Sequence, residues 1–205
     1  MAYVKKLMKL DRTIKSIRGF IIPHFERPVK ISQGYDGPWS HTSFEVRNDY
    51  GDFLRVDDDT YSLDFELPFG TNVHAAKAGV ATYVMKDSDI FYPGNDLQCG
   101  YFKMPNFIVI DHGDHSSLYS HLGRIYIHER QDVEKGRLIA ETGKTGWVGP
   151  IPHLHFEVLE NNFESQNNRG KKGRKSYPVK FDDYNDNLFD HEIRVGLDTK
   201  SWKAS

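Results

Sequence analysis

Short apolar runs separated by turn residues are the feature that most constrains how this chain can fold. From about Phe20 onward, such runs alternate with glycine, proline, asparagine and aspartate. This rhythm is typical of an antiparallel all-β domain, in which short strands are joined by tight turns. The sequence therefore predicts a mainly β fold, a compact antiparallel β-sheet domain with few helices. We expect strands at Thr60–Glu66, Asn72–Ala75, Gly79–Lys86, Phe107–Asp111, Ser116–Tyr119, Arg137–Thr142, His155–Leu159 and Ser176–Phe181.

Length and charge narrow the class of protein. The chain has 205 residues, the size of one ordinary domain with modest extensions. Its formal net charge of −2 creates no general field that would attract nucleic acid. No run of about 18 apolar residues is present, and the basic N-terminus lacks an apolar stretch of signal-peptide length. We therefore expect no nucleic-acid partner, no integral membrane segment and, in the chain as written, no export signal.

The cysteine count restricts any metal site to other ligands. Cys99 is the only cysteine, so the chain can build neither an intrachain disulfide framework nor a thiolate zinc cluster. A bound metal must therefore be held by histidine, aspartate or glutamate. The chain has 10 histidines, which makes their placement worth following.

Two histidines alternate in the segment Pro152–Glu157. If this segment is a strand, His153 and His155 point to the same face, about 6–7 Å apart. One imidazole can then bind a metal while the other acts beside it as an acid or base; a pair of solvent-facing strand histidines is the alternative. Glu157 follows on the same face and either orients a ligand through a hydrogen bond or is a surface carboxylate.

Two further residues fit a metal site. Asp64 lies between Leu63 and Phe65, where a buried carboxylate is costly unless it is paired or bound to a metal; a solvated strand face is the alternative. His121 follows the strand predicted at Ser116–Tyr119. Taken alone, His121 would be an ordinary surface histidine.

Several short motifs occur together in one order between about Gln33 and Leu159. In this order they resemble the lysostaphin and LytM type of zinc metallopeptidase. The resemblance implies that Asp64 and His155 bind zinc, and that His121 and His153 are unliganded catalytic histidines. The motifs are Asp64, Pro68–Val80, Asn106–His112, Tyr119–Leu122, Val133–Gly136, Gly143–Gly146 and Pro152–Phe156.

The first zinc ligand departs from the compact motif of that family. A histidine four residues before Asp64 is expected, and Thr60 occupies that position. Some relatives carry this histidine earlier, after a Gln-Gly turn, and here Gln33-Gly34 precedes His41. We therefore expect His41 to be the third ligand of a zinc ion, since a long loop insertion costs little closure entropy. His24 and His74 are rivals, and we expect His74 to be exposed.

The resemblance also divides the chain. We expect an N-terminal extension at 1–32 packed on the body, a metallopeptidase-like β domain at 33–160 with a zinc-bearing groove, and a polar loop with a C-terminal extension at 161–205. The basic start is either a short amphipathic helix or a strand pair. Aromatic residues are expected to form groove walls: Phe91, Tyr92, Tyr101 and Trp147.

A zinc site of two histidines and one aspartate is a catalytic type, because it leaves one position open for water. The resemblance implies hydrolysis of peptide bonds in peptidoglycan stem or cross-bridge peptides. Two other functions remain open: a catalytically silent binding or regulatory module on the same fold, and a cytosolic zinc hydrolase of another amide. The resemblance favours the cell envelope or the extracellular space, whereas the missing export signal leaves a cytoplasmic location open.

Overall fold

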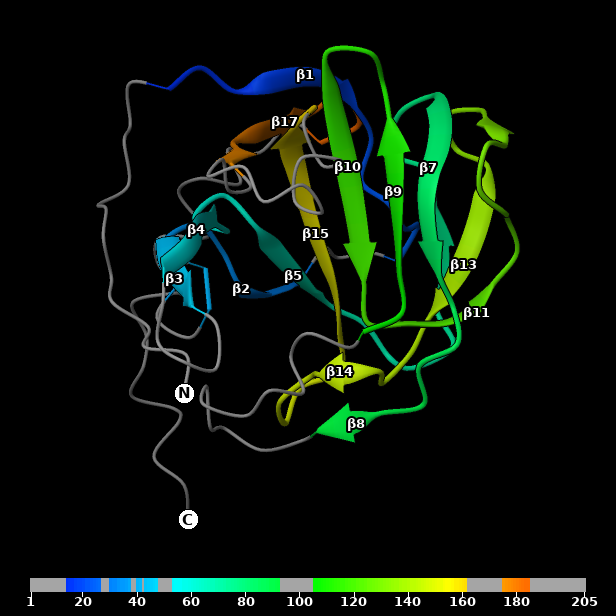
Figure 1. The fold of residues 1–205 in the computed structure, drawn as a ribbon. Helices are drawn as coiled ribbons and strands as arrows, with labels where there is room; N and C mark the ends of the chain where they lie inside the picture. The colour runs from blue at the N-terminus through cyan, green and yellow to red at the C-terminus, as the bar shows by residue number, and fades with distance from the viewer. Residues whose placement is uncertain are drawn as a thin grey trace.

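The computed structural model describes residues 14–26, 30–37, 40–41, 43–47, 53–92, 105–161 and 175–184. The described part is built from β-strands and turns, with no helix, which confirms the predicted mainly β fold (Figure 1). Within these residues, no helix is long and apolar enough to span a membrane.

One antiparallel sheet of eight strands organises the molecule. Its strand order is β12-β7-β9-β10-β15-β5-β2, and β16 pairs with β15. These strands are β2 (Ile31–Gln33), β5 (Leu63–Glu66), β7 (Gly79–Met85), β9 (Phe107–Asp111), β10 (His115–Ser120), β12 (Asp132–Val133), β15 (His153–Glu160) and β16 (Ser176–Tyr177).

Smaller sheets surround this one. A three-stranded antiparallel sheet has the order β11-β13-β6, and three two-stranded sheets pair β1 with β17, β14 with β8, and β3 with β4. Their bounds are β1 (Ile17–Phe20), β3 (Ser43–Arg47), β4 (Phe53–Asp58), β6 (Asn72–His74), β8 (Phe91–Tyr92), β11 (Leu122–Ile125), β13 (Leu138–Thr142), β14 (Gly146–Trp147) and β17 (Val179–Phe181).

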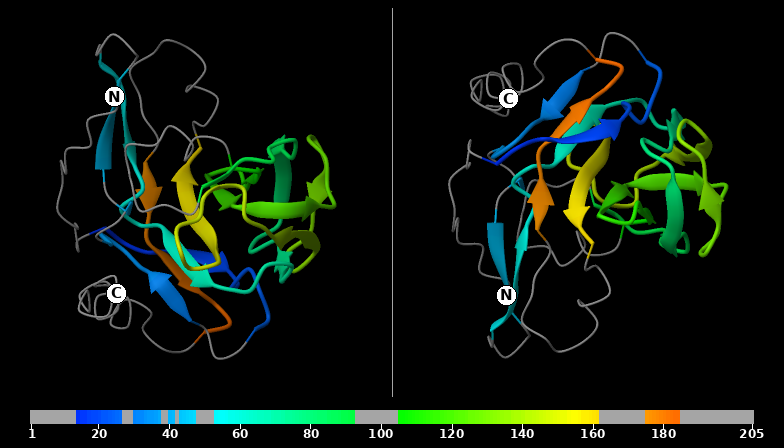
Figure 2. Two further views of the ribbon diagram at one scale, coloured as in Figure 1. Left: turned by 90° about the horizontal axis from the view of Figure 1, so that it is seen from below. Right: turned by 90° about the horizontal axis from the view of Figure 1, so that it is seen from above.

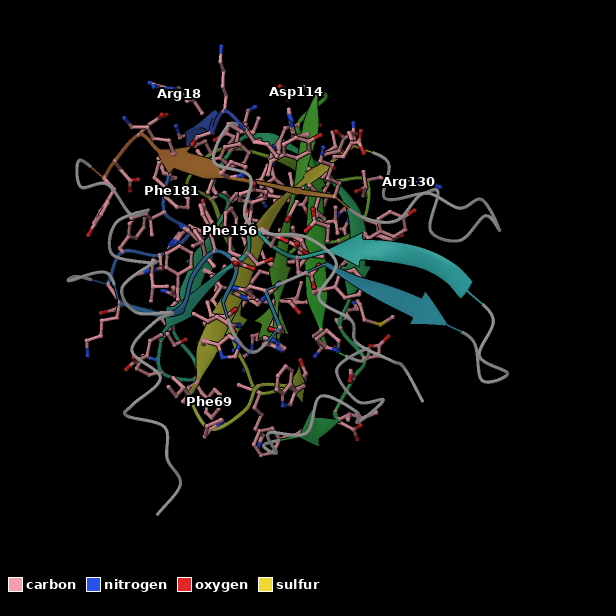
Figure 3. The ribbon with its side chains drawn as sticks, turned by 90° about the vertical axis from the view of Figure 1, so that its left-hand side faces the viewer. Arg18, Phe69, Asp114, Arg130, Phe156 and Phe181 are labelled. Atoms are coloured by element: carbon pink, nitrogen blue, oxygen red, sulfur yellow. The ribbon has the colours of Figure 1, made fainter. Side chains whose placement is uncertain are left out.

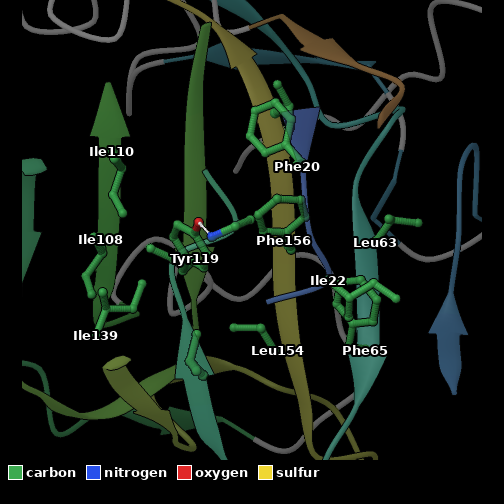
Figure 4. Packing of buried hydrophobic residues seen from close by; sticks show 14 of the residues in the cluster. Phe20, Ile22, Leu63, Phe65, Ile108, Ile110, Tyr119, Ile139, Leu154 and Phe156 are labelled. Carbon is green, nitrogen blue, oxygen red and sulfur yellow. Dashed lines mark hydrogen bonds between the residues drawn. The ribbon is translucent and has the colours of Figure 1, made fainter. Parts of the chain in front are cut away.

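The larger of two buried apolar clusters lies against one face of the main sheet. Side chains alternate along β15, so Leu154, Phe156 and Val158 point into the core while the residues between them point to the opposite face. Phe156 packs against Tyr119 of β10, with ring centroids 5.3 Å apart (Figure 4). The Tyr119 hydroxyl accepts a hydrogen bond from the backbone N–H of Ala76, which ties the main sheet to the end of β6. The opposite face of β15 carries His153, His155 and Glu157, while Leu159 farther along the strand belongs to a second, small buried cluster with Val109 and Leu118.

The chain segments at either end of the described part pair with each other. β1 and β17 form a parallel pair and lie side by side (Figure 2). Phe20 and Phe181 are buried in the core, and the backbone N–H of Ile22 donates to Asp183. In the basic start the described residues contain one strand, β1, which pairs with β17. Residues 1–13, on which the choice between a helix and a strand pair rests, lie outside the described residues.

The strand predictions are correct in position and inexact at their ends. The strand expected at His155–Leu159 begins at His153, and the one expected at Thr60–Glu66 begins at Leu63. The closing strand is two short strands, because Pro178 has no N–H for a continuous ladder.

Candidate metal centre and active site

Asp64 and His155 are brought together by strand register. They are directly opposite each other in the antiparallel pair of β5 and β15. On the other side of β5, Gln33 of β2 pairs with Asp64, and on the other side of β15, Ser120 of β10 pairs with His155. Gln33, Asp64, His155 and Ser120 therefore form one row across β2, β5, β15 and β10. This row ends next to His121, the residue that follows β10. Directly opposed side chains lie within contact distance, so register alone assembles the centre of the site.

His41 reaches the same point from a turn after β2. Its Nδ1 donates a hydrogen bond of 2.7 Å to the carbonyl oxygen of Gly34, which also accepts from the backbone N–H of Gly37. Gly37 is needed here, because a Cβ at that position would lie 2.3 Å from Cγ of Gln33. The turn therefore holds His41 with Nε2 directed at Asp64.

Three ligand atoms converge at this point. Nε2 of His41 lies 3.1 Å from Oδ1 of Asp64, and Nδ1 of His155 lies 2.9 Å from the same oxygen. The ligand atoms of His41, Asp64 and His155 all lie within 4.8 Å of one another, the only such group among the described residues.

The donor set fits a metal ion. Because Nδ1 of His41 donates to a carbonyl, Nε2 is the nitrogen with a free lone pair. That Nε2 is buried, faces a carboxylate oxygen and has no hydrogen-bond partner. Two imidazoles and one carboxylate are ligands that zinc prefers. A cation bound by both Nε2 of His41 and Oδ1 of Asp64 would give the buried Nε2 the partner that it lacks.

Gln33 orients the carboxylate of Asp64. Its side-chain amide donates to Oδ2 of Asp64 at 3.0 Å, which leaves Oδ1 for the histidines. Gln33 is fixed in turn by Ser40, which accepts from the amide nitrogen and donates its backbone N–H to the amide oxygen. Burial would raise the pKa of Asp64, but His41 and His153 and the hydrogen bond from His155 hold it well below its usual value. Asp64 is therefore an anion at every physiological pH.

Glu157 lies behind His155 on the same face of β15. It is fully buried, its Oε1 is 3.9 Å from Nε2 of His155, and its Oε2 accepts a hydrogen bond from Ser62. The surface-carboxylate alternative for Glu157 is thus wrong. Burial would lower the pKa of His155, but the carboxylates of Asp64 and Glu157 raise it to about 10. A metal at Nδ1 must therefore displace a proton.

His121 and His153 lie beside these three residues. Their rings are 4.9 Å apart, and Nε2 of His153 is 3.7 Å from Oδ1 of Asp64. This confirms that His153 and His155 share a face. Each Nδ1 is 2.8 Å from a backbone carbonyl, that of Ile151 for His153 and that of Thr145 for His121. Because a carbonyl only accepts, each neutral imidazole keeps its proton on Nδ1 and exposes Nε2 as an acceptor.

Burial keeps both of these imidazoles neutral. It lowers the pKa of His153 and, together with the neighbouring histidines His153 and His155, lowers the pKa of His121 to about 3. His121 also has a positive φ of 62°, a conformation that non-glycine residues rarely adopt. Such strain persists only where the surroundings enforce it and is concentrated at functional sites.

The turn around Gly143 enforces that conformation. The backbone N–H of Gly143 donates to the carbonyl of His121, and a Cβ on Gly143 would lie 2.3 Å from the backbone nitrogen of Gly123. Thr145 adds a second connection, since its hydroxyl accepts from the backbone of Asn106 and donates to that of Leu122.

The rival histidines lie elsewhere. His24 is buried against Phe65, and His74 is buried under Phe25, with ring centroids 4.2 Å apart. The expectation that His74 is exposed is therefore wrong, because Phe25 covers its ring. Trp147 and Phe91 lie on the paired strands β14 and β8, whereas the side chains of Tyr92 and Tyr101 lie outside the described residues.

Gln33 and Thr145 support the site, although the sequence alone indicates no role for either side chain. Gln33 was visible only as part of the Gln-Gly turn, and Thr145 acts on His121 through a backbone carbonyl. A carbonyl is present at every residue, so no sequence signal identifies that contact.

A family model for peptidase family M23 matches residues 58–168, more than half of the chain. This chain belongs to peptidase family M23. The family consists of zinc metallopeptidases, in agreement with the His/Asp/His group of the structure. The M23 match contains Asp64, His121, His153 and His155 and begins after His41, so the assignment of His41 depends on the geometry.

Curated relatives match the M23 part of the chain. Peptidoglycan DD-endopeptidase ShyA of Vibrio cholerae is 33% identical over 97 residues, which are 47% of this chain and 19% of that protein. Murein hydrolase activator NlpD of Escherichia coli is 36% identical over 85 residues, 41% of this chain and 21% of that protein. The match thus spans about a fifth of each relative.

Among solved structures, a zinc-containing peptidase from Vibrio cholerae is 26% identical to this M23 chain. The comparison has a TM-score of 0.45 and covers 73% of this chain and 38% of the other.

Proposed function

We propose that this chain is a zinc-dependent endopeptidase that hydrolyses peptide bonds in the stem or cross-bridge peptides of peptidoglycan. His41, Asp64 and His155 hold the metal in this proposal. The convergence of their three ligand atoms, beside two neutral histidines, is the observation that carries it. Zinc held by such a set keeps a position for water and supplies Lewis-acid activation near neutral pH.

The two remaining histidines perform the proton transfers. Both present an unprotonated Nε2 and are kept neutral by burial, as a general base requires. One of them, His121 or His153, takes the proton of the attacking water at Nε2. The other, once its Nε2 carries a proton, donates that N–H to the negative charge that develops on the peptide carbonyl oxygen, because its Nδ1–H is already bonded to a backbone carbonyl.

The substrate class is supported by the relatives. ShyA is a peptidoglycan DD-endopeptidase, and a third relative, 29% identical over 105 residues, is the glycyl-glycine endopeptidase ALE-1 of Staphylococcus capitis. A peptidoglycan substrate puts the action of this chain at the cell envelope. We also retain the proposed division into an extension at 1–32, the peptidase domain at 33–160 and an extension at 161–205.

The similarity to NlpD favours a second candidate, a regulatory module that binds a partner without hydrolysis. The two candidates differ in what His121 and His153 do. In a regulatory module their removal leaves function intact as long as the fold persists, whereas in a peptidase it abolishes turnover.

Zinc content and turnover of isolated muropeptides separate the roles. We expect His155→Ala to lose zinc and hydrolysis together. His153→Ala should keep zinc and lose rate by about 10²–10⁴-fold, the usual contribution of a general acid or base. Mass spectrometry of the products measures turnover. No hydrolysis by the zinc-loaded wild type would overturn the peptidase proposal, and equal zinc loss in both variants would overturn the division of roles.

A further inference from the structure

A hollow separate from the metal centre lies where β5 turns into β6. Its volume is about 390 Å³, and its lining includes Phe25, Glu26, Phe69, Thr71, Asn72 and His74. Phe69 lies at the end of the molecule where β15 begins, and so at the end that carries His153 (Figure 3). We propose that this hollow binds a neutral sugar ring.

Two exposed phenyl rings flank the hollow. Phe25 is 61% exposed and Phe69 is 48% exposed, although the chain buries most of its other phenylalanines that are described. Exposed apolar side chains that lie together beside polar groups are typical of ligand-binding sites. A pyranose has the matching surface, because its C–H faces stack on aromatic rings while its hydroxyl groups point sideways.

His74 supplies a polar group that lacks a partner. Its side chain is nine-tenths buried, and its Nδ1 has no hydrogen-bond partner. An unpaired buried nitrogen is unfavourable and rare in folded proteins. Pairing of a sugar hydroxyl with this nitrogen requires the Phe25 ring, which covers the imidazole and is mostly exposed, to rotate aside. Asn72, exposed beside it on β6, offers both an amide donor and an acceptor.

The charge of the lining argues against an anionic ligand. Glu26 is its only charged residue in the part of the chain that the structure describes, and neither lysine nor arginine contributes. Phosphate groups and carboxylates are normally held by cationic side chains or free backbone N–H groups. A neutral ligand fits this lining better.

The backbone beside the hollow argues against an extended peptide. Such a peptide usually binds by adding a strand to an open sheet edge. β6 is the last strand of its sheet, but that edge is taken: His74 donates its backbone N–H to Pro23, and Ile21 donates to Ala76. A polyol, which needs no backbone ladder, remains the chemical class that fits.

The identity of the sugar rests on the proposed function, whereas the hollow itself does not. Peptidoglycan peptides are attached to glycan strands of N-acetylated amino sugars. Phe69 follows Asp64 closely in the chain, and Leu67 between them is hydrogen-bonded to Pro152, next to His153. A glycan ring in the hollow would bring its attached peptide towards the metal centre.

Isothermal titration calorimetry with the β-1,4-linked tetramer of N-acetylglucosamine tests this proposal. We expect saturable binding to the wild type, weakened about ten-fold or more in Phe69→Ala and in Asn72→Ala. Val80→Ala, which removes a partly exposed apolar side chain on β7, serves as the matched control and should bind normally. Circular dichroism verifies that each variant is folded. Absence of binding, or equal binding by the folded Phe69→Ala variant, would overturn the proposal.

The same titration on His155→Ala separates this proposal from the peptidase function. That variant should bind the tetramer as the wild type does, although it lacks zinc and hydrolysis. Sugar binding without any muropeptide hydrolysis by the wild type would refute the peptidase proposal alone. Hydrolysis without sugar binding would refute the sugar site alone.

Discussion

At the scale of single residues, the site depends on contacts that hold the ligands rather than on the ligands alone. Asp64 is an anion in a buried position, and its second oxygen is satisfied by Gln33. Partners of this kind fix the orientation of a metal ligand, and their loss typically weakens metal binding by about 10–100-fold.

Gln33→Met tests this role with a side chain of similar volume and no amide. We predict zinc binding about 10–100-fold weaker than in the wild type, because Oδ2 of Asp64 loses its donor and the carboxylate can rotate. Competition with a chromophoric chelator measures the affinity. Ser32→Ala, which removes only a hydroxyl that bonds the Asp64 backbone carbonyl, is the control. Unchanged affinity in Gln33→Met would show that Gln33 does not orient the ligand.

At the scale of elements, two turns of the β9, β10 and β11 region carry unusual residues. The β9–β10 turn contains His112, whose ring bonds the carbonyl of Ala78 and the hydroxyl of Ser117. The β10–β11 junction contains His121 in its left-handed conformation. The first turn is expected to govern stability and the second to govern activity.

The His112 turn makes stability depend on pH. Burial, the main cause, lowers the pKa of His112 from 6.5 to about 4. Between these values the unfolded chain binds a proton that the folded chain does not, so stability falls as the pH falls from 6.5 towards 4. The loss attributable to His112 is at most about 3 kcal/mol.

Denaturant unfolding at several pH values measures this effect. His112→Gln should be less stable than the wild type near pH 7, because it loses ring hydrogen bonds, and its stability should fall less steeply below pH 6.5. Parallel curves for the two proteins would contradict the assignment of this slope to His112.

The His121 junction depends on a glycine. Gly143→Ala puts a Cβ against the Gly123 backbone nitrogen, so we predict a loss of about 1–3 kcal/mol in unfolding free energy. Hydrolysis should fall further than stability does, because His121 is displaced, while zinc content stays normal. Gly123→Ala, whose nearest contact would be 3.2 Å, should cost less. Equal costs in the two variants, measured by urea unfolding, would refute this account of the turn.

At the scale of the whole molecule, the sequence predicts much of the fold and less of the support around the site. Strand positions follow from the apolar runs of the sequence. The shared face of His153 and His155 follows from their spacing, because side chains two residues apart in a strand always point to the same face. Gln33, Thr145 and the burial of His74 depend on which segments meet in space. Phe25 lies far from His74 in sequence and covers it only because Pro23 pairs with β6.

The central claim is that His41, although distant in sequence, completes a zinc site with Asp64 and His155. Measuring the zinc content of purified protein tests it most directly, with the wild type beside His41→Ala and the exposed His128→Ala as a control. We predict about one zinc per chain in the wild type and in His128→Ala, and a large loss in folded His41→Ala, because a site with two protein ligands holds zinc weakly. A wild type without zinc, or a His41→Ala variant that keeps one zinc per chain, would contradict the claim.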